Sequence, residues 1–197
     1  MTVTIVAATG TEARAARRLA SPNVRVVECG IALAKHPQFE GLAISCGLAG
    51  GLRTGLQTGT VLVPRCVRRP DGSQLDCDDA AVDALTYAAA RLGCEVVQDP
   101  LLTSEDLVHG TQRQVWAAQG YAGVDMETGL IAAQRVACVR VVLDTPAREI
   151  SPAWVHPARA LLQPRAWLDL PFLIREGPRC STIAARIAAR AAAALSG

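Results

Sequence analysis

Several features of membrane and nucleic-acid-binding proteins are missing from this sequence of 197 residues. Apolar residues make up 50% of the chain, yet no uninterrupted apolar run reaches the ~18 residues that suggest a membrane span. The formal net charge is only +2, and the 20 basic residues are spread along the chain. We therefore expect a soluble protein that does not bind nucleic acid, with contact at a membrane surface left open.

Motifs for several kinds of chemistry are also absent. The seven cysteines form no CxxC pair, and several lie beside Val and Ile, which favours reduced core residues in a cytoplasmic protein. His36, His109 and His156 lack the spacing of metal ligands, so we expect no metal. The sequence has neither GxGxxG nor GxxxxGK[ST], and Ser45 lacks the nucleophile-elbow spacing. We expect no cofactor and no covalent protein nucleophile.

Short apolar runs alternate with helical patterns over the first 145 residues. The runs that predict strands are 3–8, 24–27, 42–46, 60–63, a segment near Val96, 122–124 and 138–143. The patterns that predict helices are one capped by Thr11, 78–92, a short one capped by Thr111, and 127–136. This alternation predicts an α/β fold in which a mixed central sheet is flanked by helices, with residues 1–197 as a single domain.

The chain changes character after Pro146, where prolines recur at 152, 157, 164, 171 and 178. We expect regular sheet structure to stop there, residues 145–153 to form a loop over a cleft, and residues 180–195 to form a helix. The large apolar side chains of the tail lie at 154, 167, 168, 170 and 172–174. They indicate core or a dimer contact, or alternatively an apolar mouth or a membrane-facing surface.

Two carboxylate motifs and one glycine turn indicate the position of a site. Asp125-Met126-Glu127 ends a short apolar run where the pattern of a helix begins, and Asp144 ends a later apolar strand. An early turn carries glycine at 47, 50 and 51. Together these segments predict one ribosyl-binding cleft, because a carboxylate at the end of an apolar strand is more suited to contact a ligand than to pack in the core.

In this order, the three motifs resemble those of the nucleoside phosphorylase and nucleosidase superfamily, above all its methylthioadenosine/S-adenosylhomocysteine nucleosidase branch. Gly47, Gly50 and Gly51 resemble the family's Gly-Ser-Ala-Gly-Gly turn, residues 125–127 its Glu-Met-Glu, and residues 143–144 its Ser-Asp. The resemblance covers most of residues 1–145. The short length, the opening at 10–14 and the Pro/Arg-rich tail look most like the hopanoid-associated phosphorylases, thought to remove adenine from adenosylhopane.

Cleavage of an N-glycosidic bond requires a neutral leaving base and a tolerated positive charge on the sugar. Asp144 is the candidate general acid at the purine N7, and burial should raise its pKa. Glu127 is the candidate acceptor for ribose hydroxyls and stabilises an oxocarbenium-like transition state. Met126 is expected to pack against the sugar, with Asp125 in the same substrate-binding triplet. The alternative is that each carboxylate caps a helix or lies on a solvated loop.

The attacking nucleophile is left open between water and phosphate. The resemblance implies that Glu12 activates water, although an acid in the first turn of a helix is also favoured by the exposed amides there. Gly10 and Arg14 repeat the Gly-x-x-x-Arg spacing of phosphorylases, which implies phosphate as a co-substrate, unless Arg14 belongs to a solvated helix face. Leu48 replaces the family's usual Ser and puts anion binding at the glycine turn in doubt.

The base-contacting residues are the least defined. Residues 102–106 occupy the place of the family's base-facing loop without its Ser-Gly-Asp, and Thr103 or Ser104 is the candidate contact to the purine. The sequence thus predicts an enzyme that cleaves an adenine nucleoside, expected from the resemblance to be a homodimer. The rivals are a catalytically silent nucleoside-binding protein on the same fold, and an NAD-dependent oxidoreductase, which the missing glycine fingerprint disfavours.

Overall fold

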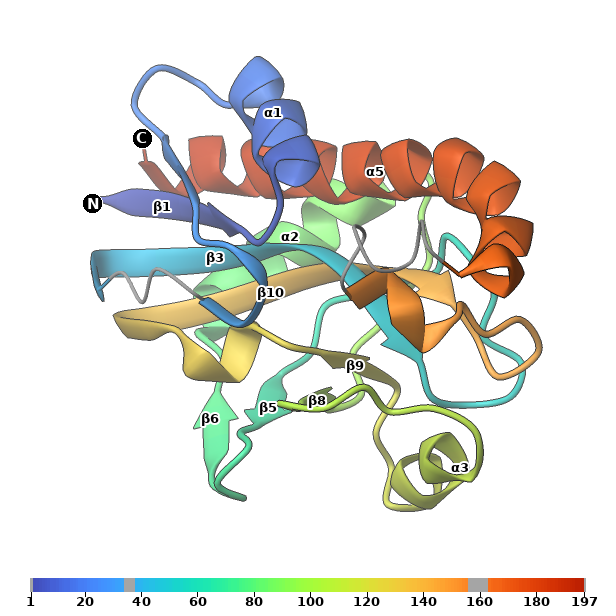
Figure 1. The fold of residues 1–197 in the computed structure, drawn as a ribbon. Helices are drawn as coiled ribbons and strands as arrows, with labels where there is room; N and C mark the ends of the chain where they lie inside the picture. Colours follow the sequence, from blue (N-terminus) through green and yellow to red (C-terminus); the bar gives the residue numbers. More distant parts are fainter. Residues whose placement is uncertain (1, 34–37, 156–162, 197) are drawn as a thin grey trace.

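Strands of very different length hydrogen-bond into one mixed sheet in the computed structural model, which describes residues 2–33, 38–155 and 163–196 (Figure 1). The strands among these residues are β1 (Val3–Ala7), β2 (Arg25–Glu28), β3 (Gln38–Gly51), β4 (Val61–Leu62), β5 (Cys66–Arg68), β6 (Gln74–Asp76), β7 (Val96–Val97), β8 (Leu101–Thr103), β9 (Gly123–Asp125) and β10 (Ala132–Asp144). Their order is β6-β5-β8-β9-β3-β10-β4-β7, with β1 on β3 and β2 on β1.

The two longest strands, β3 and β10, form the centre of this sheet. They run parallel, in a register that places Arg140 opposite Gly47 and Asp144 opposite Gly50. Strand β1 is parallel to β3, whereas β9 pairs with the end of β3 in the antiparallel direction. Because β1, β3 and β10 run in the same direction, their carboxyl ends meet at one edge of the sheet. That edge receives Asp144 and the glycines at 47, 50 and 51, which lie within β3, so the turn predicted for them is wrong.

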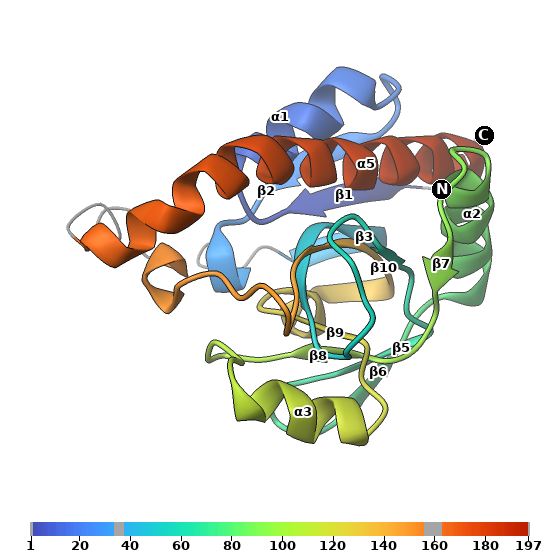
Figure 2. The ribbon, with the colours of Figure 1, turned by 90° about the vertical axis from the view of Figure 1, so that its right-hand side faces the viewer.

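Three helices cover one face of the central strands. Helix α5 (Leu170–Ser196) crosses β3 and β10 and contacts both α1 (Gly10–Leu19) and α2 (Asp79–Ala90) (Figures 1 and 2). The side of α5 that faces the core is rich in alanine, so the helix packs closely on the sheet. Among the described residues, no helix combines the length and apolar character needed to cross a bilayer.

Helix α3 (Thr111–Ala118) lies apart from this layer, below β8 and β9 in Figure 2. Its Trp116 packs against a small separate core that contains Leu102, Val108 and Val124. Short 3-10 helices are η1 (Ile31–Leu33), η2 (Thr128–Leu130), η3 (Pro152–Val155) and η4 (Pro164–Asp169). The chain is a single-domain α/β fold with a mixed central sheet flanked by helices, as the sequence predicts.

The helix predicted over residues 127–136 is wrong. Only η2 is helical there, and β10 begins at Ala132 and pairs with β3 along most of its length. The apolar run at 130–133 is too short for its pattern to distinguish a helix from a buried strand. Pairing with β3 decided the outcome, because it buries Ile131 and Val136 in one apolar cluster with Phe39.

Two predicted helix caps are also wrong. Thr9, not Thr11, caps α1, in a capping box with Glu12. Gly110, not Thr111, is the N-cap of α3 and has no side chain to offer, so the Glu149 carboxylate accepts its N–H instead. The predicted helix at 180–195 lies within the longer α5, which contains Pro178 in its first half. No sheet structure follows β10 in the described part of the tail.

Candidate active site

A cavity of about 280 Å³ opens where the carboxyl ends of the central strands meet. Its lining comes from the β1–α1 loop, α1, η1, β3, the segment before α3, α3 itself, the region around β9, β10 and the segment from β10 to η3. Of the predicted site residues, it contains Glu12, Gly50, Asp125, Met126, Glu127 and Asp144. Ile150 and Ser151, in the predicted loop over the cleft, also line it. Segments far apart in the sequence therefore form one site, as such folds commonly arrange.

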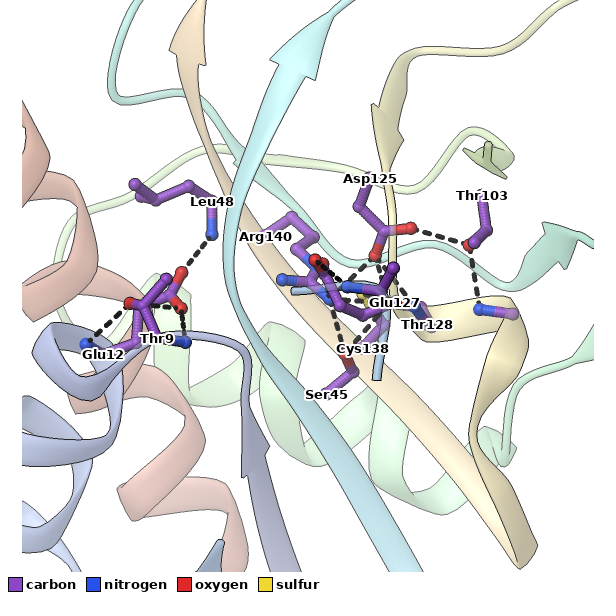
Figure 3. Close-up of polar contacts among 12 residues, drawn as sticks. Thr9, Glu12, Ser45, Leu48, Thr103, Asp125, Glu127, Thr128, Cys138 and Arg140 are labelled. Atoms are coloured by element: carbon purple, nitrogen blue, oxygen red, sulfur yellow. Dashed lines mark hydrogen bonds and ion pairs between the residues drawn. The ribbon is translucent and has the colours of Figure 1, made fainter. Parts of the chain in front are cut away.

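Glu12 is buried and held in place by the start of α1. Its Oε2 accepts hydrogen bonds from the N–H (2.9 Å) and Oγ1 (2.8 Å) of Thr9, and its Oε1 accepts the N–H of Leu48 (3.0 Å) (Figure 3). Gly47 is necessary for this arrangement, because a Cβ at that position would collide with Glu12 Oε1 and with Arg140 Nη1. The carboxylate is thus fixed at the cavity wall before any ligand arrives.

Arg140, on β10, is the centre of a buried charge cluster beside Glu12 (Figure 3). Its Nη2 lies 2.8 Å from Asp125 Oδ2 and 3.4 Å from Glu127 Oε2, and it donates to Ser45 Oγ (2.6 Å) and Thr128 Oγ1 (3.0 Å). One guanidinium is thus the ion-pair partner of two carboxylates. With Glu12 nearby, this end of the cavity carries more negative than positive charge.

The environment of Glu127 makes it a group that titrates near neutrality. Burial raises the pKa of Glu127 to about 7, with smaller contributions from the charges of Asp125 and Glu12, while Arg140 opposes the rise. The N–H of Ala32 also points to Glu127 Oε1 at 3.4 Å. Ala32 adopts a left-handed backbone conformation with φ of 52°, which is uncommon for a residue with a side chain.

Asp144 has a different cationic partner at the end of β10. Its Oδ2 accepts hydrogen bonds from Nη2 of Arg113 and from the N–H of Ile150 (3.4 Å). Burial raises the pKa of Asp144 above its usual range, although the Arg113 charge and hydrogen bond act in the opposite direction. Arg113 itself is buried, donating from Nη1 to Gly51 O (2.9 Å) and from Nε to Val108 O (3.2 Å).

The predicted base contacts lie elsewhere in the fold. The Thr103 hydroxyl donates to Asp125 Oδ1 (2.6 Å) and accepts the N–H of Gly129 (2.8 Å), so it supports Asp125 from behind. Ser104 bonds to the backbone of Asp106, two residues further on. In the described chain the cavity wall here is formed by residues 106–108, and not by Thr103 or Ser104.

The two residues predicted to hold phosphate, Gly10 and Arg14, are not among the described residues that line the cavity. Gly10 is the first residue of α1, and a Cβ there would contact the Glu28 carboxylate. Arg14 is exposed on α1 and is not among the described residues that line the cavity. Of the three glycines in β3, Gly50 lines the cavity, whereas Gly47 and Gly51 make room behind it.

Sequence reasoning missed both arginines of the site. Arg140 carried a usable signal, since a charged residue within an apolar strand is buried only when it is paired. Arg113 carried none, because its position in a short polar helix resembles that of any solvated arginine. Within the described ranges, no group of three or more His, Cys, Asp or Glu side chains is arranged to hold a metal ion.

Comparison with known proteins places the fold in one class. Family models and curated protein sequences gave no match to the chain. Solved structures gave many matches, among them nucleosidases, and this chain shares their fold. The fold implied by the sequence resemblance is therefore confirmed.

Three of these structures illustrate the match. The 5'-methylthioadenosine/S-adenosylhomocysteine nucleosidase of Neisseria meningitidis, in complex with methylthio-immucillin-A, has a TM-score of 0.72 at 17% identity, with 96% of this chain and 97% of that one covered. The nucleosidase of Colwellia psychrerythraea, in complex with adenine, has a TM-score of 0.72 at 14% identity, covering 98% and 95%. The futalosine hydrolase of Helicobacter pylori has a TM-score of 0.67 at 12% identity, covering 95% of each chain.

Proposed function

We propose that this protein cleaves the N-glycosidic bond of an adenine nucleoside by hydrolysis. The observation that carries the proposal is that Glu12 and Asp144 line one cavity at two distinct places. Glu12 lies beside Gly47 and Asp144 beside Gly50, three residues further along β3. Three residues of a strand span about 10 Å. This separation suits a nucleoside whose sugar faces Glu12 and whose base faces Asp144.

Each end of the cavity has the charge that its part of the reaction needs. At the sugar end, ionised Glu127 accepts the ribose hydroxyls, and the surplus of carboxylates over Arg140 stabilises an oxocarbenium-like sugar. Glu12 takes a proton from the attacking water, whose oxygen bonds to C1′. At the base end, the bond from C1′ to N9 breaks with its electron pair going to the purine, and Asp144 supplies a proton at N7.

Water is favoured over phosphate as the nucleophile. The only arginines of the described cavity lining are Arg113 and Arg140, and each already faces a carboxylate. Arg14 is exposed outside the lining, and the Leu48 N–H is taken by Glu12. A phosphate dianion would therefore have to displace a carboxylate from one of the two arginines.

The 5′ substituent of the substrate is proposed to be apolar. Ile31, Leu107, Ile150 and Trp154 contribute apolar surface to the cavity. Adenosylhopane, which the hopanoid-associated resemblance suggests, is the candidate with the largest apolar group. We further propose that the protein acts in the cytoplasm as a homodimer, with the apolar residues near Trp167 serving either the partner or a lipid surface.

Release of free adenine tests the proposal. Purified protein would be incubated with 5′-methylthioadenosine and an adenosylhopane analogue, with and without phosphate. We expect adenine release that does not depend on phosphate and that falls by roughly a hundredfold or more in Asp144→Asn and Glu12→Gln. Asp79→Asn, which changes an exposed carboxylate on α2, serves as the matched control. Release only in the presence of phosphate would establish a phosphorylase instead.

The rival is nucleoside binding without cleavage. It is favoured by one observation, namely that Arg113 already occupies the carboxylate oxygen of Asp144. Adenine binding measured by calorimetry, combined with no release from any substrate and unchanged affinity in Asp144→Asn, would support this rival over the enzyme.

A further inference from the structure

Arg113 has hydrogen-bonding capacity that the folded protein leaves unused. A guanidinium carries five N–H groups. Those of Arg113 donate to Val108 O from Nε, to Gly51 O from Nη1 and to Asp144 Oδ2 from Nη2. Among the described residues, one N–H on each terminal nitrogen therefore has no acceptor. Leaving such donors buried costs free energy, which a bound ligand can recover.

Nη2 of this guanidinium borders a slot that the missing side chain of Gly50 leaves open. An ideal Cβ on Gly50 would lie 3.2 Å from Asp144 Oδ1 and 3.5 Å from Arg113 Nη2. Gly50 lines the cavity, so the space that its missing side chain leaves belongs to the site. Asp144 Oδ1 accepts no hydrogen bond within the described part of the chain. The slot thus presents an arginine donor and a carboxyl oxygen side by side.

Two backbone carbonyls and two carboxylates fix this donor in place. Arg113 is 3% exposed, its Nε lies 3.8 Å from Glu149, and Glu149 in turn accepts the N–H of Gly110 at the start of α3. A guanidinium anchored in this way cannot turn away from the slot without breaking several bonds. It is a rigid recognition element and not a mobile surface charge.

We propose that Arg113 is the base-selecting residue of the site and that it extends the substrate class to 6-oxopurine nucleosides. This inference rests on the proposed function. Arginine can donate but cannot accept, and the N7 and O6 atoms of a 6-oxopurine are both acceptors, the pair that arginine binds on guanine in DNA. Adenine offers an acceptor at N7 but a donor at its 6-amino group, so only the Asp144 carboxylate can pair with that group.

The same donor serves the departing base. When the bond from C1′ to N9 breaks, its electron pair delocalises onto the purine, and in a 6-oxopurine much of that charge reaches O6 and N7. The Arg113 N–H groups hold this charge, Glu12 takes one proton from the attacking water, and the released base gains its proton from Asp144 or from solvent. Atoms and charges therefore balance without any additional reactant.

The test compares two substrates that differ only at position 6, namely 5′-methylthioadenosine and 5′-methylthioinosine. We expect the native protein to cleave both. In Arg113→Met, kcat/KM for the inosine substrate should fall by roughly ten- to hundredfold more than for the adenosine substrate, because the charged hydrogen bond to O6 exists only in the inosine substrate. Arg53→Met, which removes an arginine from an ion pair with Asp99 outside the cavity lining, should leave the ratio unchanged.

Each other outcome has a separate meaning. Equal losses on both substrates would assign Arg113 a merely structural role and overturn the inference, as would native protein that cleaves the adenosine substrate alone. Cleavage of neither substrate would instead reject the proposed function. If Arg113→Met does not fold, Arg113→Lys decides, since lysine keeps the charge but lacks the paired N–H groups and should lower the same ratio.

Discussion

The two arginines that reach the cavity are held in different ways. Arg140 projects from the central strand β10 and faces two carboxylates, Asp125 and Glu127. Arg113 projects from the short helix α3, faces one close carboxylate, Asp144, and donates to two backbone carbonyls. One end of the cavity is therefore supported by the sheet and carries surplus negative charge. The other is supported by a helix and loops and has a smaller surplus, since Arg113 faces Asp144 and the partly exposed Glu149.

This difference matches the two halves of a nucleoside. A sugar that becomes positively charged is stabilised by surplus carboxylates on a rigid support. A base that becomes negatively charged is stabilised by donors, and spare N–H groups on Arg113 provide them. The comparison also indicates where the protein is most vulnerable, because a buried carboxylate that loses its cation is costly wherever solvent cannot reach it.

Removal of Arg140 should have the largest effect. Arg140→Met leaves Asp125 and Glu127 buried without their cation, and we expect it to lower the free energy of unfolding by about 3–5 kcal/mol. Arg113→Met should lower it by less, because Asp144 is more exposed (13% against 0% for the Asp125 side chain) and can bind a proton. Urea unfolding measures both. Arg65→Met, in a surface ion pair, is the control, with a change of about 0.5 kcal/mol or less. Equal decreases in the free energy of unfolding in Arg113→Met and Arg140→Met would show that the two ends of the cavity do not differ in this way.

The second largest effect should be the pH dependence of activity and stability that Glu127 causes at the sugar end of the cavity. Because the pKa of Glu127 is raised to about 7, activity should increase as pH rises through 7 and the carboxylate ionises to accept the ribose hydroxyls. Stability should change in the opposite direction. Between pH 4.5 and 7 the folded protein holds a proton that the unfolded chain has lost, so this contribution to stability declines as pH rises.

Glu127→Gln separates these two effects from other titrations. The variant should be inactive at every pH. Its stability should decrease less between pH 4.5 and 7 than that of the native protein, because glutamine cannot bind the extra proton. Activity profiles and thermal unfolding at several pH values would measure both. An unchanged stability slope in Glu127→Gln would mean that Glu127 does not hold the extra proton.

The smallest effect is expected at the capping box. Thr9→Ala removes one of the three hydrogen bonds to Glu12 together with the N-cap of α1, and should cost about 1 kcal/mol of stability. Turnover should also fall several-fold, because Glu12 becomes less firmly oriented. Thr9→Ser, which keeps the hydroxyl, should retain both properties. A drop in turnover of equal size in Thr9→Ser would show that the hydroxyl is not what orients Glu12.

Local sequence patterns predicted some helices and strands correctly and others incorrectly. The helix 78–92 was predictable because Asp78 caps it and Gly93 ends it in a left-handed conformation. The segment after Glu127 was not, since its apolar residues suit a helix or a strand and only pairing with β3 distinguishes the two. The caps of α1 and α3 were misplaced by one or two residues, because several polar residues there could each serve.

The sequence by itself determined the α/β class and the alternation of elements, and it identified Glu12, Glu127 and Asp144 as candidate site residues, because motif order and apolar periodicity are local properties. Tertiary structure alone decided which side chains share the cavity. It brought Arg113 to Asp144 across 31 residues and Ser45 to Arg140 across 95. Such pairings depend on strand order and on the burial of charge, and a buried charge selects whichever partner the fold places beside it.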